Sequence, residues 1–121
     1  MFKNILIIGF GMIGSSIARS VIKKYKNVNI FAFDKSNNLK IRINKSKLNN
    51  VKVLKTLQEI NNLNIDLIII CVPMLQYQSI FKKLSNINLD KTIVTDVGST
   101  KVNIEKLYNQ KKYKFNFIPS H

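Results

Sequence analysis

Short apolar runs alternate with amphipathic segments along nearly the whole chain. Runs of consecutive apolar residues rich in isoleucine and valine are typical of strands that are buried on both faces of a sheet. Between these runs, apolar residues recur at the i, i+3, i+4 spacing of a helix that buries one side. The pattern predicts strands at Lys3–Ile8, Val28–Phe33, Val51–Leu54, Asp66–Val72, Thr92–Thr95 and Lys114–Ile118. It predicts helices at Met12–Tyr25, Thr56–Asn62, Tyr77–Leu84 and Lys101–Asn109, with a short helix and a loop in Asn37–Asn49.

Strands that alternate with helices predict parallel pairing through right-handed crossovers. We therefore expect an α/β fold of the Rossmann type, a doubly wound and mainly parallel sheet with helices on both faces. The length of 121 residues predicts one domain over residues 1–121. Such sheets bind ligands at the carboxyl ends of their strands. The residues that follow predicted strand ends are Gly9, Asp34, Pro73, Asp96 and Ser99.

Composition limits the classes of function. Apolar residues make up 45% of the chain, which is enough for a buried core. The formal charge is +14, but Arg19 and Arg42 are the only arginines among 20 basic residues. Specific nucleic-acid sites favour arginine, so we attribute the charge to A/T-rich codon usage and predict no nucleic-acid partner. The apolar run Leu67–Pro73 is far shorter than the ~20 residues of a membrane span. The single cysteine, Cys71, predicts an inert buried thiol and fits a cytoplasmic protein.

The first predicted strand leads directly into a glycine-rich segment. Gly9, Gly11 and Gly14 form the pattern G-x-G-x-x-G, and it opens the predicted helix from Met12. In a dinucleotide site the first glycine permits the tight turn and the second leaves room for the pyrophosphate. The third lets the helix pack against the strand. The backbone N–H groups of Met12 and Ile13 would face the phosphates.

The three aspartates near predicted strands receive different interpretations. Asp34 follows the second strand, 20 residues after Gly14, which is where a dinucleotide site places the acid that binds the ribose hydroxyls. Asp34 would also repel a 2′-phosphate, so the pattern favours NAD over NADP, although Lys35 weakens that preference. Asp66 precedes its strand and is interpreted as a turn residue at the other end of the sheet. Asp96 needs no role beyond that of a turn or cap.

Four segments resemble the prephenate dehydrogenase family, which includes arogenate and cyclohexadienyl dehydrogenases. The segment from Gly9 to Ser16 is similar to the family's G-x-G-L-I-G-G-S opening, and Asp66 to Pro73 is similar to its D-L-V-I-L-A-V-P strand. Thr95 to Lys101 resembles its T-D-V-G-S-V-K signature, and Phe117 to His121 resembles the start of its F-x-x-x-H-P-I-A-G segment. The last two segments are the more specific.

The resemblance implies NAD-dependent oxidative decarboxylation of prephenate or arogenate in tyrosine biosynthesis. By the same resemblance, His121 is the catalytic histidine that accepts or hydrogen-bonds the hydroxyl proton, and Ser99 orients that hydroxyl. Val72 and Pro73 would line the nicotinamide side. The family binds the substrate carboxylate with a helical second domain, which also forms its dimer. We therefore expect this chain to be the cofactor-binding half of a truncated enzyme, inactive alone and dimeric only at full length.

Two other functions fit part of the pattern. A regulatory nucleotide-sensing Rossmann module needs the glycines and Asp34 but makes no use of Ser99 or His121. Another β-hydroxyacid-type dehydrogenase would share the cofactor domain, but such enzymes carry a different serine/threonine motif after the fifth strand. Ser99 could also serve only as the N-cap of the helix predicted from Lys101.

Overall fold

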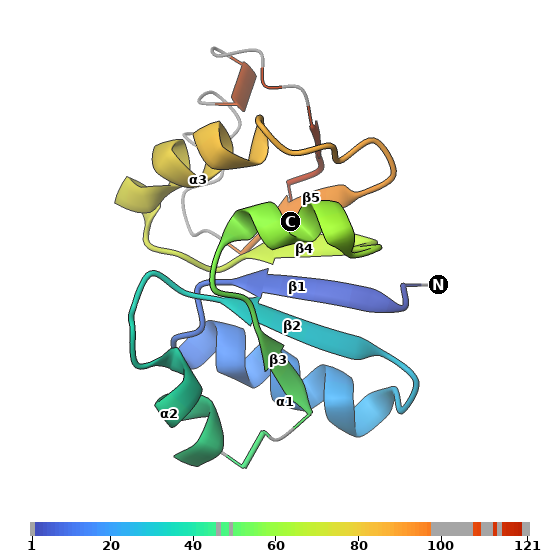
Figure 1. Cartoon of the computed structure of the whole chain (residues 1–121), viewed down its shortest axis with the longest axis vertical. Coiled ribbons are helices and arrows are strands. Elements are labelled where there is room, and N and C mark those ends of the chain that lie inside the picture. Colours follow the sequence, from blue (N-terminus) through green and yellow to red (C-terminus); the bar gives the residue numbers. More distant parts are fainter. Residues whose placement is uncertain are drawn as a thin grey trace.

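The fold is a six-stranded parallel sheet with the strand order β3-β2-β1-β4-β5-β6. The computed structural model describes residues 2–45, 47–48, 50–97, 108–109, 113 and 115–119. The strands are β1 (Asn4–Ile8), β2 (Asn29–Phe33), β3 (Val51–Val53), β4 (Leu67–Ile70), β5 (Ile93–Asp96) and β6 (Asn116–Phe117). The helices are α1 (Met12–Lys24), α2 (Leu39–Lys45) and α3 (Tyr77–Leu84), with 3-10 helices η1 (Leu57–Asn62) and η2 (Met74–Gln76). Their arrangement confirms the predicted doubly wound α/β sheet (Figure 1).

Alternate side chains of the central strand β1 enter two separate cores. Leu6 and Ile8 face the side covered by η1 and α3, where Phe81 is a fully buried ring. Ile5 and Ile7 face the side covered by α1 and α2, where Ala18 is fully buried. Because both faces of the strand are covered by helices, its sequence is apolar throughout.

Several elements differ in detail from the sequence-based prediction. The helix predicted at Thr56–Asn62 forms as the 3-10 helix η1, and the carboxylate of Glu59 accepts the N–H of Thr56 at 2.8 Å in a capping box. The short helix predicted within Asn37–Asn49 forms as α2. The sixth strand is shorter than predicted and covers Asn116–Phe117. Most of the helix predicted at Lys101–Asn109 lies outside the described residues.

Candidate functional site

The carboxyl ends of the central strands bring the predicted site residues to one edge of the sheet. Ile8 is in register with Phe33 of β2 and with Ile70 of β4, and Ile70 is in register with Asp96 of β5. The segments that follow these strands therefore begin side by side. In Figure 1 they lie where the arrowheads of β1, β2 and β4 converge, beside the start of α1. This is the edge at which open α/β sheets bind ligands.

Gly9 and Gly14 are required by the packing of the chain itself. Gly9 has a φ of 92°, a conformation that favours glycine, and a Cβ there would lie 2.8 Å from the backbone of Cys71. A Cβ on Gly14 would lie 2.2 Å from the carbonyl oxygen of Gly9. The turn is fixed further by the N–H of Gly9, which donates to the carbonyl of Phe33 at 2.8 Å. These two glycines let α1 start directly against the end of β1.

Gly11 has no such packing requirement. A Cβ built on Gly11 would meet no atom within 4 Å among the described residues. Gly11 is the N-cap of α1, whose first turn carries no acidic residue, and Ser15 turns its hydroxyl back to the carbonyl of Gly11 at 2.7 Å. The N–H groups of this first turn and the positive end of the helix dipole are therefore available to an anion. A pyrophosphate fits this open face of Gly11.

The carboxylate of Asp34 lies against the glycine-rich turn. One oxygen, Oδ2, accepts the N–H of Phe10 at 2.7 Å and lies 3.2 Å from a terminal nitrogen of Arg42. The other oxygen, Oδ1, accepts the N–H of Ser36 at 2.9 Å. Partial burial opposes ionisation, but the hydrogen bonds from Ser36, Phe10 and Arg42 outweigh it and hold the pKa of Asp34 below its usual value. Asp34 is thus an ionised acceptor at neutral pH, held beside the turn where a ribose would lie.

Sequence reasoning did not identify Arg42 as a member of this site. Its guanidinium extends from α2 and donates to the carbonyl of Phe10 at 2.9 Å while it contacts Asp34. Arg42 therefore connects α2, the end of β2 and the glycine-rich turn. One signal was present in the sequence, because an arginine stands eight residues after Asp34 in a chain whose basic residues are otherwise almost all lysine.

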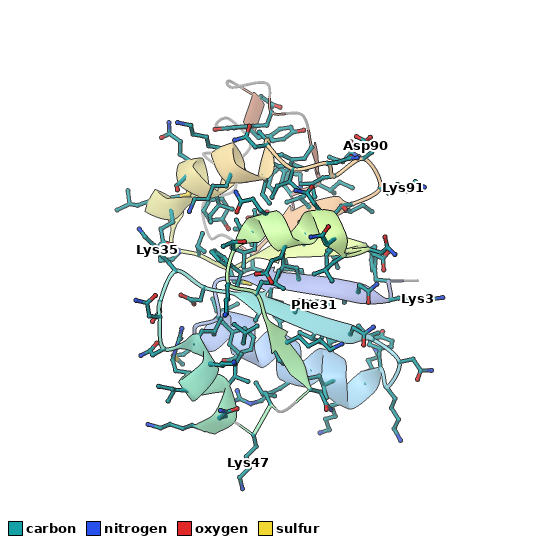
Figure 2. All side chains as sticks on the ribbon, in the orientation of Figure 1. Lys3, Phe31, Lys35, Lys47, Asp90 and Lys91 are labelled. Atoms are coloured by element: carbon teal, nitrogen blue, oxygen red, sulfur yellow. The ribbon has the colours of Figure 1, made fainter. Side chains whose placement is uncertain are left out.

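Val72 and Pro73 follow β4 at the same edge. Val72 is half-buried, and its Cγ1 would lie 2.8 Å from a Cβ on Gly9, while Pro73 is exposed. A small recess beside them is lined by residues that include Gly9, Lys35 and Gln76. Figure 2 shows Lys35 at this edge of the sheet, whereas Lys3 lies at the opposite edge. Val72 thus borders the glycine-rich turn, and Pro73 follows it at the same edge of the sheet.

Asp96 lies in the interior of the sheet, and Cys71, directly after β4, is half-buried. Asp96 is the last residue of β5 and is fully buried, so it is a strand residue rather than the predicted turn or cap. Burial, with a smaller contribution from the charge of Asp96, raises the pKa of Cys71 to about 12. A thiol with this pKa is protonated at neutral pH, in agreement with the predicted inert role. Burial also raises the pKa of Tyr77, with smaller contributions from Asp96 and Cys71, and the Tyr77 hydroxyl donates to the carbonyl of Ile70 at 3.2 Å.

Asp66 lies at the amino end of the sheet, away from these residues. Its Oδ2 accepts the N–H groups of Lys3 at 2.8 Å and Asn4 at 2.9 Å, and so joins the start of β4 to the start of β1. These hydrogen bonds lower the pKa of Asp66. The interpretation of Asp66 as a structural residue at the other end of the sheet agrees with these contacts.

The two predicted catalytic residues, Ser99 and His121, lie outside the described residues. Within the described ranges, no helix combines the length and apolar composition needed to cross a membrane. No group of three or more His, Cys, Asp and Glu side chains in the same ranges could hold a metal ion.

Comparison with known proteins identifies a family for most of the chain. The family described as "Prephenate dehydrogenase, nucleotide-binding domain" matches residues 17–121. The chain is 35% identical over 123 aligned residues to prephenate dehydrogenase of Lactococcus lactis, with 98% of this chain and 33% of that protein covered. It is 30% identical over 121 residues to cyclohexadienyl dehydrogenase of Zymomonas mobilis, with 100% of this chain and 41% of that protein covered. The chain thus spans between a third and two fifths of the length of these relatives.

A solved structure supports the same fold. Prephenate dehydrogenase of A. aeolicus, crystallised with hydroxyphenyl propionate and NAD+, superposes with a TM-score of 0.73 at 22% identity. That superposition covers 100% of this chain and 42% of the A. aeolicus chain. The family match begins at residue 17 and so does not include the glycine-rich turn. The interpretation of that turn as a nucleotide site rests on its geometry.

Proposed function

Because the chain belongs to the prephenate dehydrogenase family and corresponds to its nucleotide-binding domain, we propose that it binds NAD for the oxidative decarboxylation of prephenate or arogenate. The observation that carries the proposal is the open face of Gly11, which lies between the free N-terminus of α1 and the ionised carboxylate of Asp34. A dinucleotide needs these two features next to each other, one for its pyrophosphate and one for its ribose hydroxyls.

Each site residue that the structure describes has a defined task in this proposal. The N–H groups of Met12 and Ile13 hold the pyrophosphate across Gly11, and Asp34 accepts hydrogen bonds from the adenosine ribose. Val72 and Pro73 border the nicotinamide side of the turn. Bound NAD supplies the hydride acceptor.

The catalytic part of the proposal rests on the family resemblance. A neutral imidazole suits the hydroxyl proton because its unperturbed pKa is ~6.5. We assign that proton to His121, and we assign the orientation of the hydroxyl to Ser99. The substrate-binding and dimer-forming parts would come from a further helical domain, since the relatives are two to three times as long as this chain. Such an enzyme of tyrosine biosynthesis would act in the cytoplasm.

Nucleotide binding can be tested on the 121-residue chain. We expect the fluorescence of NADH to change and to reach saturation as the chain is added. Asp34→Ala should weaken binding, because the ribose loses its hydrogen-bond acceptor. Asp90→Ala is the matched control, since it makes the same change at an exposed aspartate away from the carboxyl edge of the sheet. A wild-type chain that does not bind NADH would contradict the proposal.

Catalysis is tested on the protein made from the complete gene. We expect prephenate- or arogenate-dependent formation of NADH, and we expect His121→Asn to abolish it while NADH affinity is retained. NADH binding without turnover of either substrate would favour the regulatory module. Turnover of a β-hydroxyacid instead would favour the other class of dehydrogenase.

A further inference from the structure

The Arg42 guanidinium is positioned to serve the cofactor site as well as to hold it together. One terminal nitrogen donates to the carbonyl of Phe10, and the other contacts Asp34 at 3.2 Å. Its Nε is buried and has no hydrogen-bond partner within the described ranges. A guanidinium has five N–H donors, so the terminal nitrogens of Arg42 retain N–H groups beyond these two contacts. The Arg42 side chain is 36% exposed, which leaves these groups accessible.

The space beside Arg42 is open and positively charged. A recess of about 410 Å³ is lined by Phe10, Gly11, Met12, Ser15, Arg42 and Lys45. Two of these residues are cationic, none is acidic, and Ser15 adds a hydroxyl. The nearby acid, Asp34, is in ionic contact with Arg42, so the net charge of that pair is zero. Lys35, directly after Asp34, adds a further positive charge at the same edge.

This arrangement changes the effect that Asp34 should have on the choice between NAD and NADP. An acid at the end of the second strand ordinarily selects NAD, because it binds the 2′-hydroxyl and repels a 2′-phosphate. A phosphate on that hydroxyl would lie next to Asp34 and therefore near Arg42, whose terminal nitrogen is 3.2 Å from the Asp34 carboxylate. Arginine binds phosphate through paired N–H donors, so attraction by Arg42 would offset the repulsion between Asp34 and the phosphate.

We propose that Arg42 is a specificity-determining residue that lets this site take the 2′-phosphate of NADP as well as the free hydroxyl of NAD. The proposal rests on the proposed function, because it assumes that a dinucleotide binds across Gly11 with its ribose at Asp34. Phe10 and Ser36 hold Asp34 through backbone N–H groups, so the carboxylate keeps its place when Arg42 is changed. Removing the guanidinium should therefore expose the charge of Asp34 to the phosphate.

The test compares the dissociation constants of NADH and NADPH in four proteins at low ionic strength. We expect the wild-type chain to bind both within roughly tenfold of each other, and Arg42→Gln to weaken NADPH at least about tenfold more than NADH, as for a partly screened pair of charges. Arg42→Lys restores the charge and should recover most of the NADPH affinity. Lys40→Gln makes the same change of charge at an exposed position of α2 outside the recess and should leave the ratio unchanged.

Three results would overturn the proposal. They are a wild-type chain that binds NADH but excludes NADPH by a hundredfold or more, an equal loss of both affinities in Arg42→Gln, and no recovery in Arg42→Lys. A wild-type chain that binds neither nucleotide would instead contradict the proposed function. Circular dichroism of each variant separates loss of the fold from loss of the phosphate contact.

Discussion

At the scale of single residues, the glycines of the turn serve two different purposes, since some are needed for folding and one is open to a ligand. Gly14 is pressed against the carbonyl oxygen of Gly9, whereas Gly11 faces open space. The same pattern in the sequence therefore contains two positions that the fold requires, Gly9 and Gly14, and one position, Gly11, at which the fold would accept a side chain. Only Gly11 is free to be shaped by a ligand.

Gly14→Ala should accordingly lower stability, whereas Gly11→Ala should mainly weaken nucleotide binding. The new Cβ at Gly14 would lie 2.2 Å from a backbone oxygen, so α1 must shift, at a cost of about 2–3 kcal/mol of unfolding free energy. Gly11→Ala should cost less than about 1 kcal/mol, the range of N-cap changes, yet weaken NADH by crowding the pyrophosphate. Urea unfolding and NADH titration measure the two effects. Equal destabilisation by both variants would contradict this assignment.

Asp66 predicts a dependence of stability on pH that is separate from the cofactor site. Its pKa is lowered by the N–H groups of Asn4 and Lys3, so its stabilising effect is complete above the unfolded pKa of about 3.9. That effect is lost as the pH falls through the lower folded pKa. We expect Asp66→Asn to be less stable than wild type at neutral pH, and the difference to shrink below about pH 4. A difference that stays constant through the acid range would show that the charge of Asp66 is not its source.

At the scale of elements, the sequence was most informative where a strand is buried on both faces. The observed β1 and β2 begin within one residue of their predicted starts and end at their predicted ends, because consecutive apolar residues leave little choice of conformation. The predicted helix at Thr56–Asn62 became the 3-10 helix η1. Its buried residues Leu57 and Ile60 are three apart, a spacing that suits three residues per turn as well as 3.6. A single turn cannot distinguish these periods from sequence.

The candidate site was predictable only where it is local in sequence. The glycine-rich turn and Asp34 follow strands that the pattern located, so their meeting at one edge could be expected. Arg42 reaches the carbonyl of Phe10 across a separation of 32 residues, and this contact depends on how α2 packs. No periodicity encodes that packing, so the charge partner of Asp34 emerged only from the structure.

The attachment of β6 to the sheet depends on a ring of α3. Phe81 is fully buried and makes edge contacts with Phe115 and Phe117, with centroids 5.3 and 5.2 Å away. Phe81→Leu should lower the unfolding free energy by about 1–2 kcal/mol through lost packing and ring contacts. It should also speed hydrogen exchange at the N–H of Ile118, which donates to Val94 at 2.8 Å.

Phe2→Leu is the matched control for this prediction. Phe2 is 39% exposed, so the same substitution there should change stability by less than about 0.5 kcal/mol. Unfolding in urea and exchange followed by NMR give the two readouts. If Ile118 keeps its protection in Phe81→Leu, then the aromatic contacts do not hold β6 in place.

At the scale of the whole molecule, the basic residues behind the charge of +14 are spread along the sequence from Lys3 to Lys114. Figure 2 shows Lys35 at the carboxyl edge of the sheet, Lys3 and Lys91 at the opposite edge, and Lys47 below α2. Charges distributed in this way raise the concentration of any anion near the surface. The field should therefore affect how fast an anionic cofactor arrives more than how long it stays.

This division can be measured through the kinetics of NADPH binding. Between about 20 and 300 mM salt the Debye length falls from roughly 20 to 6 Å, so distant lysines stop contributing to attraction. We expect the association rate to fall several-fold over that range while the dissociation rate stays nearly constant. We expect Arg42→Gln to speed dissociation and to leave the salt dependence of association almost unchanged, because it removes one of the 20 basic residues of the chain. If Arg42→Gln abolished the salt slope, attraction would arise at the recess itself, and the remaining lysines would have no part in cofactor capture.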